Sequence, residues 1–136
     1  MQHCVFCAIR DGREPAHRVA EDEHALAIMD INPRNDGHVL VIPRRHVETM
    51  FEIPEFDLLA TIRLSRRVVA GIRAALTPDG LHLIHNSGRA AQQSVPHLHL
   101  HLIPRWFNDG KRFDWELRPG DPVRLSALAE RIRAKL

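Results

Sequence analysis

The chain is 136 residues long, which suits one compact domain and argues against a two-domain enzyme. Hydrophobic residues make up 44% and charged residues 26% of it, a balance typical of globular proteins rather than disordered or fibrous ones. The 19 basic and 17 acidic side chains leave a net charge of only +2, which gives no support for binding to a nucleic-acid backbone. One feature of the composition is unusual: ten histidines stand against no tyrosine.

The N-terminal residues bear on the compartment of the protein. They contain neither the basic nor the apolar region of a signal peptide, and no apolar run reaches the ~20 residues of a membrane span. The two cysteines, Cys4 and Cys7, are too few for a disulfide framework, and C-x-x-C in a non-secreted chain indicates metal or redox chemistry. We expect a soluble, cytoplasmic protein without a membrane partner.

Two strands are predicted ahead of the longest helix. An apolar run at 24–29, a polar loop at 32–37 and a β-branched run at 39–42 predict two antiparallel strands joined by a turn. From Glu55 to Leu76, apolar residues recur at helical spacing and arginines fall on the other side. The predicted apolar stripe is Leu58, Ile62, Val69, Ile72 and Leu76. A solvated face is the expected role of the arginines, which are Arg63, Arg66, Arg67 and Arg73.

Two more strands and a closing helix follow. Turn residues at 77–80 end the long helix, and the runs at 81–85 and 96–103 are predicted as strands separated by a polar loop. Asp121 can cap a last helix that has Pro122 at its first position. The buried stripe of this helix is expected to be Leu125, Leu128, Ile132 and Leu136.

These elements predict a single α+β domain over residues 1–136. Antiparallel strands with inserted helices favour an open sheet of about five strands with two helices. Because an open sheet exposes its edges, we expect a homodimer that extends the sheet. The segment 106–136 begins with four of the seven aromatic residues, for which a dimer or core contact is expected; they are Trp106, Phe107, Phe113 and Trp115.

Three histidines alternate with leucines in the last predicted strand, at 97–103. Because side chains in a strand alternate between its two faces, His97, His99 and His101 share one face while the leucines belong to the core. Packing gives no reason for three imidazoles at this spacing, so the pattern indicates chemistry.

Two chemistries fit this arrangement. Three histidines can hold a zinc ion with an open position for water, as in zinc hydrolases. Alternatively, a neutral imidazole can attack a phosphorus atom while its neighbours donate protons to the phosphate and the leaving group. The stretch from Asn86 to Asn108 contains amides and hydroxyls but no carboxylate. It favours phosphate binding, because a catalytic zinc site usually includes a carboxylate.

The same residues carry a resemblance to a known family. The motif His-φ-His-φ-His-φ-φ stands at 97–103, Asp30 begins Asp-Ile-Asn-Pro, Gly37 begins Gly-His-Val-Leu-Val-Ile-Pro, and Asn86 begins Asn-Ser-Gly. These motifs, within about residues 4–105, resemble the histidine triad (HIT) family of nucleotide hydrolases and nucleotidyltransferases, in its Hint-like, dinucleoside tetraphosphate hydrolase-like branch. The resemblance implies the HIT fold.

Position by position, the resemblance implies a set of site residues. His99 would be the nucleophile that takes the nucleotidyl group, and His101 would contact the phosphate. His38 would lie beside the nucleophile, and His97 would complete the catalytic set. Asp30 would bind the ribose hydroxyls, although an aspartate there can also simply start a turn. The phosphate and leaving group would be contacted by Asn86, Gln93 and Ser94, and the purine would enter an apolar slot formed by Val5, Phe6, Ile9, Ile28 and Ile31.

The resemblance also implies a structural metal site. Some bacterial members of the family hold zinc with a C-x-x-C pair, a histidine after the Pro-x-x sequence and the first triad histidine. Here these positions are Cys4, Cys7, His46 and His97, which form a Cys₂His₂ ligand set. The zinc would be structural, and the reaction itself would need no cofactor.

The function expected from the resemblance is cleavage of a phosphoanhydride or phosphoramidate bond in an adenine or other purine nucleotide. The substrate would be of the dinucleoside polyphosphate or adenosine phosphoramidate type, and the intermediate would be a nucleotidyl-histidine at His99. Two alternatives stay open. One is a zinc-dependent hydrolase that uses the three triad histidines as ligands, and the other is a non-enzymatic nucleotide-binding scaffold on the same fold.

Overall fold

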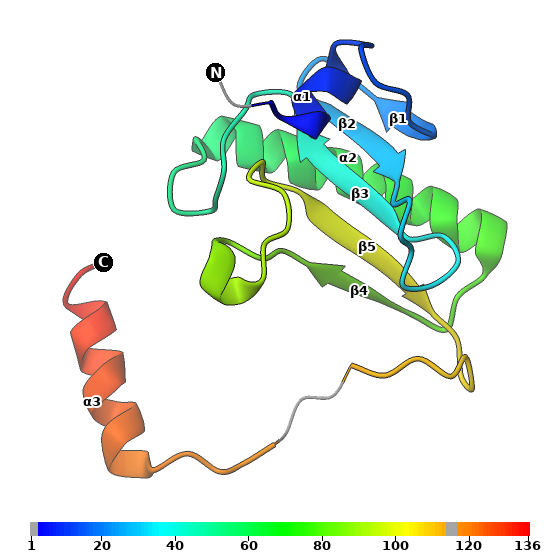
Figure 1. Cartoon of the computed structure of the whole chain (residues 1–136). Helices are drawn as coiled ribbons and strands as arrows, with labels where there is room; N and C mark the ends of the chain where they lie inside the picture. Colours follow the sequence, from blue (N-terminus) through cyan, green and yellow to red (C-terminus); the bar gives the residue numbers. More distant parts are fainter. Residues whose placement is uncertain (1–2, 114–116) are drawn as a thin grey trace.

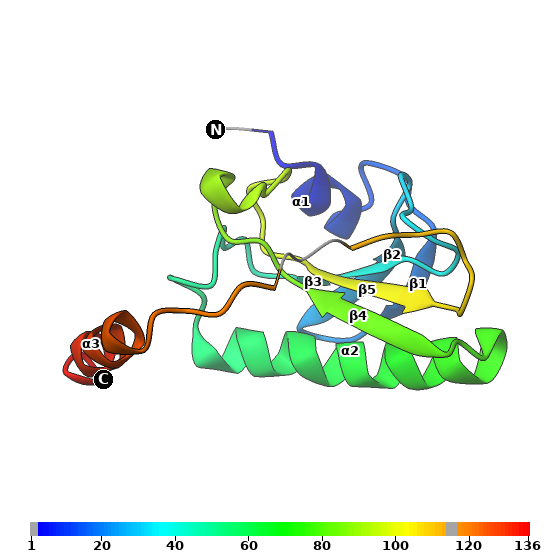
Figure 2. The ribbon, with the colours of Figure 1, turned by 90° about the horizontal axis from the view of Figure 1, so that it is seen from below.

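The computed structural model describes residues 3–113 and 117–136, and places an open five-stranded antiparallel sheet between two helices (Figures 1 and 2). The strand order is β1-β2-β3-β5-β4. The elements in chain order are α1 (Val5–Arg10), β1 (Arg18–Glu21), β2 (Ala25–Met29), β3 (Val39–Pro43), α2 (Glu55–Leu76), β4 (Gly80–Ile84), the 3₁₀ turn η1 (Arg89–Ala91), β5 (Leu100–Arg105) and α3 (Pro122–Arg133). The predicted fold class is confirmed.

The central strands β2 and β3 are buried on both faces, which explains why their sequences are apolar without alternation. They pair antiparallel from Ala25 opposite Pro43 to Met29 opposite Val39. Figure 2 shows α1 on one face of the sheet and α2 on the other. Along β2, the alanines pack in the cluster beneath α2, whereas Leu26 and Ile28 pack in the cluster beneath α1.

The long helix α2 has the predicted bounds, but its predicted apolar stripe was largely wrong. Ile62 is 40% exposed and Leu76 is 39% exposed. The buried face consists of Ala60, Thr61, Leu64, Ser65, Val68 and Ile72, together with Asp57. Its hydroxyls bond to backbone carbonyls one turn earlier, Thr61 to Asp57 at 2.7 Å and Ser65 to Thr61 at 2.8 Å, which makes their burial possible. The four arginines are exposed, as expected.

The triad segment is extended, but only its second half belongs to the sheet. The strand β5 begins at Leu100, four residues later than predicted, and pairs with both β3 and β4. Before it, the backbone N–H of Leu98 donates to the carbonyl of Val47 at 2.8 Å. Side-chain alternation nevertheless continues through the segment: Leu98, Leu100 and Leu102 all lie in the cluster beneath α2. The predicted separation of leucines from histidines is therefore correct.

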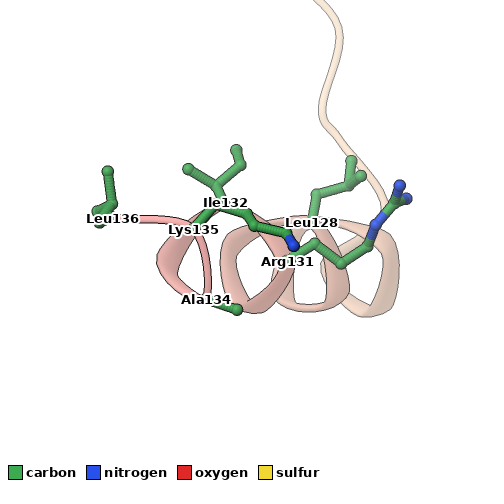
Figure 3. A pocket seen from close by; sticks show the side chains of 6 residues that line it. All are labelled: Leu128, Arg131, Ile132, Ala134, Lys135 and Leu136. Atoms are coloured by element: carbon green, nitrogen blue, oxygen red, sulfur yellow. The ribbon is translucent and has the colours of Figure 1, made fainter.

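The last helix forms where predicted but does not pack on the sheet. The Asp121 side chain accepts the N–H of Val123, and Pro122 occupies the first turn. In Figure 1, α3 lies apart from the sheet. Leu128, Ile132 and Leu136 project from one side of α3 (Figure 3), and Ile132 is 63% exposed. The expectation of a buried stripe was wrong for this chain, because nothing in its described part covers that side. Trp115 lies outside the described residues.

None of the described helices is long and apolar enough to cross a membrane.

Candidate active site

Four imidazoles gather on the face of the sheet that α1 covers. His38, His97 and His99 are buried, and His101 is partly buried. His38 directly precedes β3, whose residue Leu40 pairs with His101 of β5, so the two strands bring these side chains together. The Phe6 ring of α1 packs edge-on against His99, with ring centroids 5.1 Å apart. A six-residue helix thus closes one side of the triad.

The hydrogen bond made by His99 fixes its tautomer. Its Nδ1–H donates to the carbonyl of His97 at 2.7 Å. The proton is therefore held on Nδ1, and Nε2 keeps its lone pair. Burial lowers the pKa of His99, so the imidazole is neutral at physiological pH. A buried, neutral and oriented imidazole is chemically able to act as a nucleophile.

His38 and His101 form a second oriented pair. The backbone N–H of Arg34 donates to Nδ1 of His38 at 3.0 Å, so the neutral ring of His38 carries its proton on Nε2. That N–H donates to Nδ1 of His101 at 2.9 Å, and His101 in turn carries its proton on Nε2. Burial, followed by the neighbouring imidazoles of His99 and His38, lowers the pKa of His101 to about 4. An oxygen of Asp30 lies 3.4 Å from Nε2 of His38.

A cavity of about 550 Å³ opens beside these imidazoles, within the range of roughly 300–1,000 Å³ typical of small-ligand pockets. Its walls come from α1, the loop before β1, the end of β2 and the segment that leads into β5. The predicted site residues that line it are Val5, Phe6, Ile9, Ile28, Asp30, Ile31, Ser94, His99 and His101. The structure therefore brings together most of the predicted nucleotide-binding set.

Two predicted binding residues, Asn86 and Gln93, do not line this cavity. The Gln93 side chain is committed to the backbone around it. Its oxygen accepts the N–H of Gly88 at 2.6 Å, and its nitrogen donates to the carbonyls of Glu48 and Val95 at 2.7 and 3.0 Å. Gln93 thereby fixes the shape of the loop that carries Ser94.

Asp30 forms a turn contact and also lines the cavity. One carboxylate oxygen accepts the N–H of Asn32 at 2.8 Å, which is the expected turn-forming contact. The side chain also lines the cavity next to His101. The turn contact thus holds the carboxylate at the rim of the site.

Some residues of the site were not foreseen from the sequence. The loop at 14–17 lines the cavity. The sequence predicted no strand after this loop and contained no motif that indicated a role for it. His85 also lacked an assigned role. Its Nδ1–H donates to the carbonyl of His99 at 3.1 Å, and its Nε2 accepts from the hydroxyl of Ser87, so it supports the triad backbone from behind.

A separate cluster joins α1 to the start of the triad. The ligand atoms of Cys4, Cys7, His46 and His97 all lie within 4.8 Å of one another. His97 Nε2–H donates to the carbonyl of Pro43 at 2.9 Å, which leaves the lone pair of Nδ1 facing the cysteine sulfurs at 3.4 and 3.6 Å. Nδ1 of His46 lies 3.1 Å from Nδ1 of His97 and 3.3 Å from the Cys7 sulfur.

Two thiols and two imidazole nitrogens converging on one point match the donor set of a tetrahedral zinc site. The bond from His97 Nε2 to a carbonyl is the outer contact that typically orients a ligating histidine. By contrast, the described residues do not group His97, His99 and His101 together around one point: His97 belongs to the cysteine cluster, and His101 groups instead with Asp30 and His38. The geometry therefore separates His97 from the two triad histidines that line the cavity.

Comparison with known proteins identifies the family. The HIT domain model matches residues 11–108. The chain belongs to the HIT family. The resemblance carried by the sequence motifs is thereby confirmed. The match ends before α3, so residues 109–136, the C-terminal arm, lie outside the matched domain.

Relatives extend over most or all of the chain. An uncharacterised HIT-like protein of Methanocaldococcus jannaschii is 45% identical over 108 residues, covering 79% of this chain and 83% of the relative. The adenosine 5'-monophosphoramidase hnt1 of Schizosaccharomyces pombe is 34% identical over 134 residues, covering 98% of each chain.

Solved structures resemble the whole chain. A HIT family member from Bacillus subtilis has a TM-score of 0.90 at 34% identity, covering 99% of this chain and 98% of its own. A zinc-bound histidine triad protein from Mycobacterium smegmatis has a TM-score of 0.77 at 38% identity, covering 96% of both chains. The family to which this chain belongs thus includes a nucleotide phosphoramidase and a zinc-bound protein.

Proposed function

We propose that the chain is a nucleotide hydrolase or nucleotidyltransferase that cleaves a purine nucleoside phosphoramidate or phosphoanhydride through His99. The observation that carries this proposal is the bond from His99 Nδ1–H to the carbonyl of His97, which leaves a buried, unprotonated Nε2 beside the cavity. The phosphoramidase activity named for the S. pombe relative favours the same class of substrate.

In the proposed reaction, the lone pair of His99 Nε2 attacks the α-phosphorus, and the bond from phosphorus to the leaving nitrogen or oxygen breaks. His101 stays neutral and donates a hydrogen bond from its Nε2–H to the leaving atom, while His38 holds its other nitrogen. A leaving phosphate departs as the anion, and a leaving amine takes its proton from the solvent. Water then attacks the phosphorus, the Nε2–P bond breaks with its electron pair returning to His99, and the water proton passes to the solvent. A nucleoside monophosphate is released and His99 recovers its starting state.

Two further groups serve binding in this proposal. The apolar walls of the cavity, with Phe6, Ile9 and Ile28, hold the purine, and Asp30 accepts hydrogen bonds from the ribose hydroxyls. Ser94, at the triad end, donates to the phosphate. Gln93 shapes the loop that carries Ser94, which replaces the ligand contact expected for it, whereas the contact predicted for Asn86 stays a prediction.

We also propose that Cys4, Cys7, His46 and His97 hold a structural zinc ion. The converging donor atoms support it, and so does the zinc-bound M. smegmatis relative. Zinc would lock α1 and the triad segment together and supply no catalytic step. Reduced thiols are required for such a site, which favours the cytoplasm as its location.

Metal analysis tests the zinc site. Protein purified without a histidine tag is expected to contain about one zinc per chain, and Cys7→Ser to lose most of it. A wild-type content of less than a few tenths of an equivalent would contradict the site. Rapid loss of turnover on chelation, reversed as rapidly by zinc, would instead favour the zinc-hydrolase alternative.

Substitution of the nucleophile tests the activity. His99→Ala is expected to lower turnover by about 10³-fold or more while nucleoside monophosphate still binds. His24→Ala, which alters a partly exposed histidine outside the cavity, is the matched control and should retain full activity. The substrates are diadenosine tetraphosphate, adenosine phosphoramidate and an aminoacyl adenylate analogue. Binding of nucleotide without turnover of any of them would point to a scaffold protein.

A further inference from the structure

The cavity extends across the sheet, away from the triad. From His99 and His101 on the β5 side it passes Leu40 of β3 and Ile28 of β2, and it ends at the loop 14–17 that leads into β1. Neighbouring strands lie about 4.8 Å apart, so three spacings, roughly 14 Å, separate β5 from β1. If the phosphate lies at the triad, as proposed above, the base must point toward the loop 14–17.

The far end of the cavity has a distinct chemistry. Its apolar walls are suited to pack against the faces of a flat ring, whereas the loop contributes two polar side chains, Glu14 and His17. The other polar residues of the lining are Asp30, Asn32, Ser94, His99 and His101; two of them are triad histidines, and Asp30 lies 3.4 Å from His38. A carboxylate at the end of an apolar slot is placed to read the edge of a base rather than its face.

The Glu14 carboxylate is available for this contact. In the described part of the chain it makes no ion pair, and the arginines on either side of it in the sequence pair with other carboxylates. Arg13 pairs with Asp11 at 3.2 Å, and Arg18 pairs with Glu21 at 3.0 Å. The loop itself is anchored: the backbone N–H of Glu14 donates to the carbonyl of Ala8 in α1 at 3.2 Å.

We propose that Glu14 reads the base edge and makes the site selective for guanine nucleotides over adenine nucleotides. Guanine presents two adjacent donors, N1–H and the N2 amino group, which match the two acceptor oxygens of a carboxylate. Adenine presents the lone pair of N1 beside its amino group, so the same carboxylate gains one bond and meets one repulsion. This inference rests on the proposed function only for the orientation of the nucleotide.

Binding of three monophosphates tests the proposal. Wild-type protein is expected to bind GMP about tenfold more tightly than AMP, and IMP, which lacks the N2 amino group, to fall between them. Glu14→Ala should remove the preference by weakening GMP and leaving AMP unchanged or slightly tighter. Glu14→Gln should also lose most of it, because one acceptor becomes a donor. Since Glu14 is exposed, both variants should melt like wild type.

The control is Glu23→Ala, which removes a carboxylate that is 88% exposed and lies outside the cavity. It should keep the wild-type ratio of GMP to AMP affinity. A wild-type preference for AMP, equal affinities, or a preference unchanged by Glu14→Ala would each overturn the proposal. Failure of the proposed function has a different signature: base selectivity in binding would persist, but neither guanosine nor adenosine phosphoramidate would be turned over.

Discussion

At the scale of single residues, the site depends on proton positions as much as on residue identity. Three imidazoles with the same sequence spacing receive three different hydrogen-bond partners. His97 donates from Nε2 to Pro43, His99 donates from Nδ1 to His97, and His101 accepts at Nδ1 from His38. These bonds support the proposed division of roles, in which His97 would bind metal, His99 would attack and His101 would donate a hydrogen bond. The spacing of the histidines could predict a shared chemistry, but not this division, which depends on the hydrogen-bond partner that the fold places beside each ring.

The lowered histidine pKa values predict how stability varies with pH. Burial lowers the pKa of His101 to about 4, whereas in the unfolded chain it titrates near 6.5. Between these values the unfolded chain binds a proton that the folded chain does not, so the free energy of unfolding should fall as the pH drops from about 6.5 to 4. Urea unfolding at pH 7.5 and 5.0 measures this. The loss should be smaller in His101→Gln, and an unchanged loss would contradict the assignment.

At the scale of elements, the connection between β2 and β3 positions the site through a glycine. Gly37, directly before His38, has a φ of +81°, and a Cβ there would lie 2.6 Å from Leu76 and 3.1 Å from Pro104. The positive φ favours glycine at this position, and an added Cβ would in addition require the side chains of Leu76 and Pro104 to shift.

Two alanine substitutions therefore have opposite expected effects. Gly37→Ala should destabilise the fold by about 1–3 kcal/mol and lower activity, because His38 must shift. Gly71→Ala, in the open middle of α2 with nothing within 4 Å of the added Cβ, should stabilise it by about 0.5–1 kcal/mol. Chemical denaturation of both variants gives the comparison. Similar effects of the two substitutions would show that the turn tolerates a side chain.

The elements differ in how far the sequence determines them. The bounds of α2 follow from its length and amphipathic pattern, and β2 and β3 from their apolar runs. By contrast, α1 has only six residues, too few for a helical period, and β1 is a mostly exposed edge strand with an irregular register. Both are stabilised by contacts with the rest of the fold, so the sequence did not predict either of them. The loop 14–17 lies between these two elements, and its place in the cavity wall was therefore not predicted.

At the scale of the whole molecule, the arm that carries α3 supports the expectation of a homodimer, which stays a proposal. An isolated helix of 12 residues is marginal in water, yet α3 presents Leu128, Ile132 and Leu136 on one exposed side (Figure 3). The B. subtilis structure matches 99% of this chain, so its similarity extends over the arm. A second copy of the chain would cover this side. The helical spacing of the apolar residues in the sequence could not show whether they are buried within one chain or against a second copy.

Substitutions in α3 test this expectation. Leu128→Glu is expected to lower the mass in solution from dimer to monomer, because it places a charge on the apolar side. Ser126→Glu, at an exposed position of the same helix, is the control and should stay dimeric. Light scattering distinguishes the two. A wild-type protein that is already monomeric at micromolar concentration would contradict the dimer.

The central claim is covalent catalysis by His99, and trapping the intermediate tests it most directly. Wild-type protein is mixed with a nucleoside phosphoramidate labelled at the α-phosphorus, quenched under alkaline denaturing conditions that preserve phosphorus–nitrogen bonds, and mapped by mass spectrometry. The label is expected on His99, and His99→Ala should carry none. Label on another residue, or full turnover by His99→Ala, would contradict the account.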